Sequence, residues 1–305
     1  MALDNPAFNN PAFQDQRAVQ TYPGGPQAAN IGSSSQTSSA QHGATDVAAQ
    51  AQLEGMYAAP AAGAVDTDRM TVEDTVIKTV GLFAILLVTA VVGWVWTMAG
   101  VDAANPNPSM APWLIGGIGG FIMSMVVIFG SRKKIRPALI FGYAAFEGLF
   151  VGGISAFFEF LYEGIVIQAT LATFSVVGVT LALFASGKIR ASAKATKIFL
   201  IAMVGYLVFS LLNVLLMVFN VPMAGGAFGL LSQKVFGIPL GLIIGVVVVI
   251  MAAYSLVLDF DNIQRGVKNR APRQYAWLGA FGIMVTVVWL YVEILRILAI
   301  LRGNN

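Results

Sequence analysis

From Thr79 onward, long apolar runs alternate with short polar segments. A helix of about 20 residues, rising 1.5 Å per residue, crosses a hydrocarbon core of about 30 Å. The chain lacks the ten-residue alternation of barrel strands, and an open strand edge cannot be left in lipid. The pattern predicts an all-α membrane protein with seven transmembrane helices, near Thr79–Met98, Pro112–Gly130, Pro137–Phe160, Ile165–Ser186, Ile198–Phe219, Val235–Leu258 and Tyr275–Leu301.

The chain divides into a tail, residues 1–68, and a seven-helix membrane domain, residues 69–305. The tail is rich in Ala, Gly, Gln and Ser and has few large apolar side chains, so we expect it to be disordered. It has no basic segment followed by an apolar core, which excludes a signal peptide. Asn5–Phe8 recurs as Asn10–Phe13, either as a docking motif or through low-complexity drift.

Positive charge falls on alternate loops of the predicted bundle. Basic residues follow the second, fourth and sixth spans, whereas the loop at 101–111 and the loop at 161–164 carry none, and the segment 220–234 has only Lys234. Basic loops face the cytoplasm in most membrane proteins. We therefore expect a cytoplasmic N-terminus and a C-terminus outside, in a membrane that is best matched by a bacterial inner membrane.

Composition narrows the function classes. The chain is 57% hydrophobic and 11% charged, has no cysteine, and has one histidine, His42, in the tail. A disulfide framework, a zinc centre and a histidine acid/base site in the membrane are thereby excluded. The motifs H-E-x-x-H, G-x-S-x-G and the P-loop are also missing. We expect no enzyme activity, cofactor, metal site or nucleic-acid partner.

Small residues at four-residue spacing predict close helix contacts. They are Gly116 and Gly120, Gly148 and Gly152, and the series Gly237, Gly241 and Gly245.

Ionisable residues in the spans are the candidates for function, because a charge in the bilayer is costly. Glu147 lies about 15 Å into the third span. It can be a proton or cation site, or a neutral carboxyl hydrogen-bonded to a neighbouring helix. Asp259 and Asp261 point to different sides of a helix end, so one can face the bundle while the other meets Arg265 or Lys268.

Glu293 and Arg296 stand three residues apart on one face of the seventh span and can neutralise each other. This structural pair is one reading of Glu293; a second reading follows from a family resemblance.

Three stretches resemble the Bax inhibitor-1 family of membrane proteins, including its YccA-like branch. They are Phe146–Ser155, Tyr254–Ile263 and Trp289–Ile294, and the resemblance extends from about Met70 to Leu301, without the tail. It implies six helices around a central seventh. It also implies a pH-sensitive calcium leak, in which two carboxylates on the sixth and seventh helices share a proton and an arginine after the second helix joins the closed state.

Carried onto this sequence, the resemblance assigns gating and pH sensing to Asp259, Glu293 and Arg132. Glu147 and Asp261 are further candidates for the ion pathway. Two close carboxylates cannot both ionise cheaply and would titrate as a unit. If Glu293 lies too far along its helix to meet Asp259, Glu147 becomes the better buried titrating group.

The leading hypothesis is a leak channel for calcium, or for protons with it, gated by carboxylate protonation. Calcium would bind weakly, because it requires six or more oxygens and the spans offer few carboxylates. Protons are likewise expected as weakly bound permeants. The alternative is a non-conducting modulator of membrane-protein quality control that acts on a membrane-anchored ATP-dependent protease through the tail. A secondary transporter would show internal repeats with broken helices, which the sequence lacks.

Overall fold

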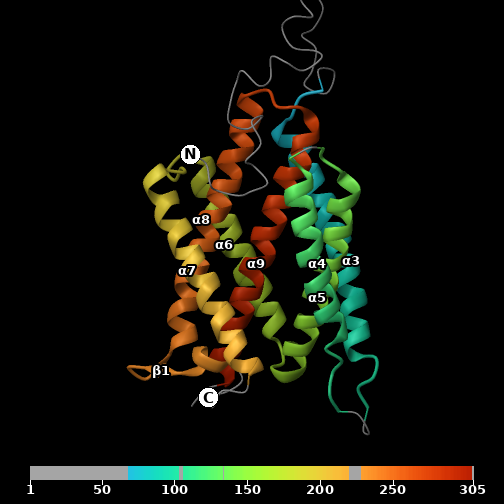
Figure 1. The fold of residues 1–305 in the computed structure, drawn as a ribbon, viewed down its shortest axis with the longest axis vertical. Helices are drawn as coiled ribbons and strands as arrows, with labels where there is room; N and C mark the ends of the chain where they lie inside the picture. The colour runs from blue at the N-terminus through green and yellow to red at the C-terminus, as the bar shows by residue number, and fades with distance from the viewer. Residues whose placement is uncertain (1–67, 103–105, 133, 220–227, 304–305) are drawn as a thin grey trace, which may run out of the picture.

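The computed structural model describes residues 68–102, 106–132, 134–219 and 228–303, and the predicted disordered tail, apart from Asp68, lies outside them. Within these residues, seven helices are long and apolar enough to cross a membrane. The predicted all-α, seven-span fold is confirmed. With the labels of Figure 1, the spans are α3 (Val72–Met98), α4 (Ala111–Gly130), α5 (Pro137–Leu161), α6 (Ile165–Ala185), α7 (Ala193–Val218), α8 (Leu240–Lys268) and α9 (Ala276–Gly303).

The helix α9 occupies the centre of the bundle (Figure 1). Half of its most apolar stretch is buried, the largest share among these spans, and it packs against α3, α5, α6 and α8. On one side α3 and α4 pack closely on α5, while α7 on the other side meets the bundle mainly through α8 and the adjoining 3₁₀ turn η4 (Gly229–Ser232). The implied arrangement of six helices around the last one is therefore observed.

Glycine allows the closest helix contacts. A Cβ added to Gly152 of α5 would lie 1.9 Å from the carbonyl oxygen of Ala90 on α3, and one at Gly116 of α4 would lie 2.3 Å from the Phe150 nitrogen. In lipid the hydrophobic effect does not drive helices together, so their association depends on close packing of this kind. The predicted packing role is confirmed for these faces, but Gly237 is not part of a helix face. It lies in the turn of a hairpin of β1 (Lys234–Val235) and β2 (Ile238–Pro239).

Several helices extend beyond the predicted apolar spans. The helix α3 begins at Val72 instead of Thr79, and α8 continues to Lys268 instead of ending at Leu258. The added turns are polar, so they lengthen the helix without lengthening its apolar stretch.

The two ends of the bundle differ in charge. We call the end with the α4–α5, α6–α7 and α8–α9 connections the basic end, and the other the opposite end. At the basic end the α8–α9 connection, which includes the 3₁₀ turn η5 (Arg273–Tyr275), and the start of α3 project beyond the other helices (Figure 1).

Candidate functional site

A polar cluster lies on the α8–α9 interface in the half of the bundle near the basic end. Ser255, Asp259 and Asn262 are spaced four and three residues apart, which places them on one face of α8. Opposite them on α9, the Thr286 hydroxyl donates to Asp259 Oδ2 over 2.7 Å, and its oxygen lies 3.4 Å from Ser255 Oγ. We call these four residues the Asp259 cluster.

Because the cluster is buried, a charge on Asp259 is costly in free energy. The Asp259 residue is only 1% exposed and Thr286 only 4% exposed. A charged carboxylate is costly at such a position, although a hydroxyl donor favours the charged form. Asn262 Nδ2 is buried and has no hydrogen-bond partner among the described residues. Leaving a buried donor unused costs about 1–3 kcal/mol, so the cluster holds more polar groups than packing alone would favour.

A second cluster joins α7 to α9 nearer the opposite end. Arg296 forms an ion pair with Glu293, one turn earlier on α9, and Glu293 is 3% exposed. The Tyr206 hydroxyl on α7 donates to Glu293 Oε2 over 3.1 Å and accepts from Arg296 Nη1 over 2.8 Å. We call these three residues the Arg296 cluster. Of the two arrangements considered for Glu293 from the sequence, the structure has the ion pair with Arg296.

The structure does not bring Glu293 to Asp259. On α9, Glu293 follows Thr286, the partner of Asp259, by about two turns, or roughly 10 Å. On α8, the Glu293 carboxylate lies beside Gly245, 3.5 Å from a Cβ built there, and Gly245 precedes Asp259 by about four turns. Because α8 extends to Lys268, the residue that faces Asp259 on the antiparallel α9 is the threonine and not the glutamate.

Arg132 lies just beyond the end of α4 and is exposed. Its guanidinium carbon stands 5.6 Å from the centre of the Phe129 ring, a cation–π contact with its own helix end.

Glu147 belongs to a different interface. It is half-buried on α5, and a Cβ added to Gly120 of α4 would lie 2.8 Å from its Oε2. The Tyr143 hydroxyl, one turn earlier, is its hydrogen-bond partner. The Tyr143 ring packs edge-on against Phe281 of α9, with 4.9 Å between ring centres. Tyr143 therefore links Glu147 to the central helix.

Asp261 forms an ion pair with Arg265 one turn later on α8. Its side chain is 16% exposed and that of Arg265 46%, so the pair lies toward solvent at the helix end. Asp259 faces the bundle and Asp261 meets the basic segment, as the two-residue spacing predicted.

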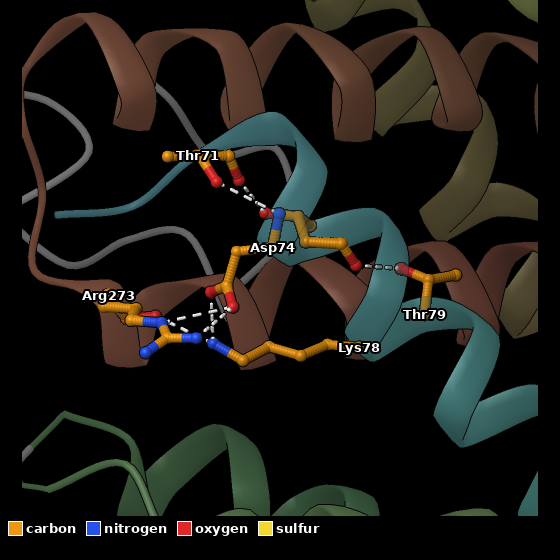
Figure 2. Close-up of polar contacts among 6 residues, drawn as sticks. Thr71, Asp74, Lys78, Thr79 and Arg273 are labelled. Atoms are coloured by element: carbon orange, nitrogen blue, oxygen red, sulfur yellow. Dashed lines mark hydrogen bonds and ion pairs between the residues drawn. The ribbon is translucent and has the colours of Figure 1, made fainter. Parts of the chain in front are cut away.

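A third cluster was missed by sequence reasoning. Asp74 of α3 accepts from Arg273 Nη2 over 3.0 Å and pairs with Lys78, whose Nζ also donates to the Arg273 carbonyl over 3.2 Å (Figure 2). The Thr71 hydroxyl caps the helix by accepting from the Asp74 nitrogen. The Met70 amide donates to the Ala271 carbonyl over 2.8 Å.

These contacts, which we call the clasp, join the first and last spans at the basic end. The capping sequence Thr71–Asp74 was a readable signal for the helix start. The partnership with Arg273 was not readable, because it joins residues from opposite ends of the membrane domain.

Comparison with known proteins assigns the chain to a family. Neither a curated protein nor a solved structure matches it. A family model described as Bax inhibitor 1 like matches residues 5–303. The match includes most of the tail, so our expectation that the resemblance begins near Met70 was too narrow; low-complexity composition offers few specific residues by which to recognise it. Because the match covers nearly the whole chain, this membrane protein belongs to the Bax inhibitor 1 like family.

Proposed function

We propose that the protein is a pH-sensitive cation leak of its membrane, with calcium as the expected ion, and that the protonation of Asp259 controls conduction. One observation carries the proposal: a carboxyl group that is 1% exposed accepts a 2.7 Å hydrogen bond from Thr286 at the junction of α8 with the central helix. A buried ionisable group in a span is a functional candidate by default.

The chemistry of the pair suggests how a proton could act. An ionised carboxylate only accepts hydrogen bonds, whereas a protonated one also donates. Adding a proton to Asp259 removes its charge and allows the hydrogen bond with Thr286 to reverse. Such a local change can bias two packings of α8 against α9, which is how protonation switches act on larger elements.

The oxygens of Asp259, Ser255 and Thr286 are hard ligands of the kind that calcium accepts. Among the described residues, however, no three His, Cys, Asp or Glu side chains gather where they could hold a metal ion. A permeating cation would therefore be held weakly and released quickly, which suits a leak better than a storage site.

The test is calcium flux into proteoliposomes between pH 5 and pH 8. Asn has the shape of a protonated Asp and no charge, so Asp259→Asn should hold the flux, at every pH, near the value that the wild type shows in acid. Asp261→Asn is the matched control, since that carboxylate lies two residues away in an ion pair at the helix end. It should keep the wild-type pH dependence.

Three results would contradict the proposal. Wild-type flux no greater than that of empty liposomes at any pH would exclude a leak, and deletion of residues 1–68 would then test the protease-modulator alternative. Equal flattening in Asp261→Asn would show a general charge effect. Flattening in Glu147→Gln with a normal Asp259→Asn profile would move the sensor to the α4–α5 interface.

A further inference from the structure

A lateral groove of about 520 Å³ opens between α3 and α6. Its walls are formed by the Phe83–Trp94 stretch of α3 and the Val166–Phe174 stretch of α6, and its floor by α5 and α9. The floor includes Gly152 on α5 and Val288 on α9, both buried. Val91 on α3 and Phe174 on α6 are 64% and 66% exposed, so the groove opens outward at its rim.

We propose that this groove binds one acyl chain of a phospholipid from the leaflet at the opposite end. The inference is independent of ion conduction.

The position and length of the groove favour this occupant. The helix α3 runs from the basic end toward the opposite end, and five of the six residues of its lining stretch lie in the second half of its length. That stretch is about 17 Å long at 1.5 Å per residue, close to the roughly 15 Å thickness of the hydrocarbon core in one leaflet. A chain entering from the leaflet can thus lie along the whole groove.

The lining chemistry also fits an uncharged chain. No charged side chain lines the groove, and its polar members are hydroxyls. Ser155 Oγ and Tyr291 OH bond to each other at 2.7 Å across the α5–α9 contact, and the Thr173 hydroxyl donates to the Ala169 carbonyl over 2.7 Å. The Ser155, Tyr291 and Thr173 hydroxyls are thus bonded within the protein, and the groove suits a hydrocarbon better than a charged headgroup.

An acyl chain in the groove would touch the centre of the bundle. The floor residues Val287, Val288 and Tyr291 belong to the turns of α9 between Thr286 and Glu293. The bound lipid would therefore contact the part of the central helix that connects the Asp259 cluster to the Arg296 cluster.

Native mass spectrometry of the protein extracted in mild detergent tests the proposal. We expect the wild type to retain one phospholipid under conditions that strip the surrounding lipids. Val91→Trp and Thr170→Trp each place an indole in the groove and should lower the retained fraction severalfold. The control is Val204→Trp on α7, because Val204 is 63% exposed, nearly the same as Val91, and does not line the groove. It should leave retention unchanged.

A second measurement uses only the wild type, so it tests the proposal even if the tryptophan variants are poorly expressed. The wild type is reconstituted with a phospholipid that carries a diazirine near the end of its acyl chain, and adducts are mapped after irradiation. Adducts on Val287 or Tyr291 would support the groove, because both lie on its floor. A wild type that retains no lipid and shows no floor adducts would overturn the proposal, as would equal lipid loss in Val204→Trp, which would show surface lipid only.

Discussion

The two buried carboxylates on α8 and α9 differ in the side chains with which they form ion pairs and hydrogen bonds. Glu293 has a guanidinium and a phenol as partners, whereas Asp259 accepts from a hydroxyl. Protonation of Glu293 would leave the half-buried Arg296 guanidinium without its counter-charge, which costs free energy. A hydroxyl can serve either form of an acid. The resemblance implied that the two carboxylates share a proton, whereas in the structure Glu293 pairs with Arg296 and Asp259 accepts from Thr286.

The largest effect should come from breaking the ion pair. Glu293→Gln leaves the half-buried Arg296 guanidinium without its counter-charge, and removing one partner of a buried pair costs roughly 3–5 kcal/mol. The measurement is the free energy of unfolding by chemical denaturation in detergent micelles. The double variant Glu293→Gln/Arg296→Met removes both charges and should recover most of the loss. A loss below about 1 kcal/mol, as for an exposed pair, would show that Arg296 finds solvent.

A smaller loss is expected at the Asp259 cluster. Thr286→Val removes the donor to a buried carboxyl group, at a cost of about 1–3 kcal/mol in the free energy of unfolding. Thr173→Val is matched to it, since both threonines are 4% exposed and the Thr173 hydroxyl bonds to its own helix. The control should cost less. Equal losses would mean that the Thr286–Asp259 bond contributes nothing specific.

The salt bridge at the end of α8 should matter less again. Asp261→Asn removes an i,i+4 pair at the helix end, and such pairs contribute about 0.3–0.5 kcal/mol. Unfolding in low and high salt checks this, because screening should erase the difference between variant and wild type. A loss that persists in high salt would indicate a buried role for Asp261.

The clasp should affect local opening with almost no change in global stability. Asp74→Asn weakens the contact with Arg273 and Lys78, and the backbone bond from Met70 to Ala271 then opens more often. Hydrogen exchange at the Met70 amide should accelerate severalfold while the unfolding midpoint stays nearly constant. Glu73→Gln on the same turn is the control, since Glu73 is exposed. Unchanged exchange in Asp74→Asn would show that backbone pairing alone holds the junction.

The spans were predictable from sequence because their apolar runs have to match the membrane. Their ends were less predictable. Asp74 and Lys78 precede the apolar run that begins at Thr79, yet they lie within α3, where they pair with each other and both contact Arg273 from the far end of the domain. Hydropathy alone cannot anticipate such long-range pairing.

The candidate site was predictable in part. A carboxylate in an apolar run is visible, so Asp259, Glu293 and Glu147 could be named. Thr286 could not, because threonine is common in spans and only the register between α8 and α9 shows that it faces Asp259. The same register separates Glu293 from Asp259.

The central position of α9 has a consequence for biosynthesis. Chains are made from the N-terminus, so the helix that fills the core of this bundle is the last of the spans to leave the ribosome. Until it inserts, Asp259 lacks Thr286, Tyr206 lacks its charged partners, and the start of α3 lacks the segment to which it is clasped. A chain that stops short of Ala276 would therefore lack the helix that fills the centre of the bundle.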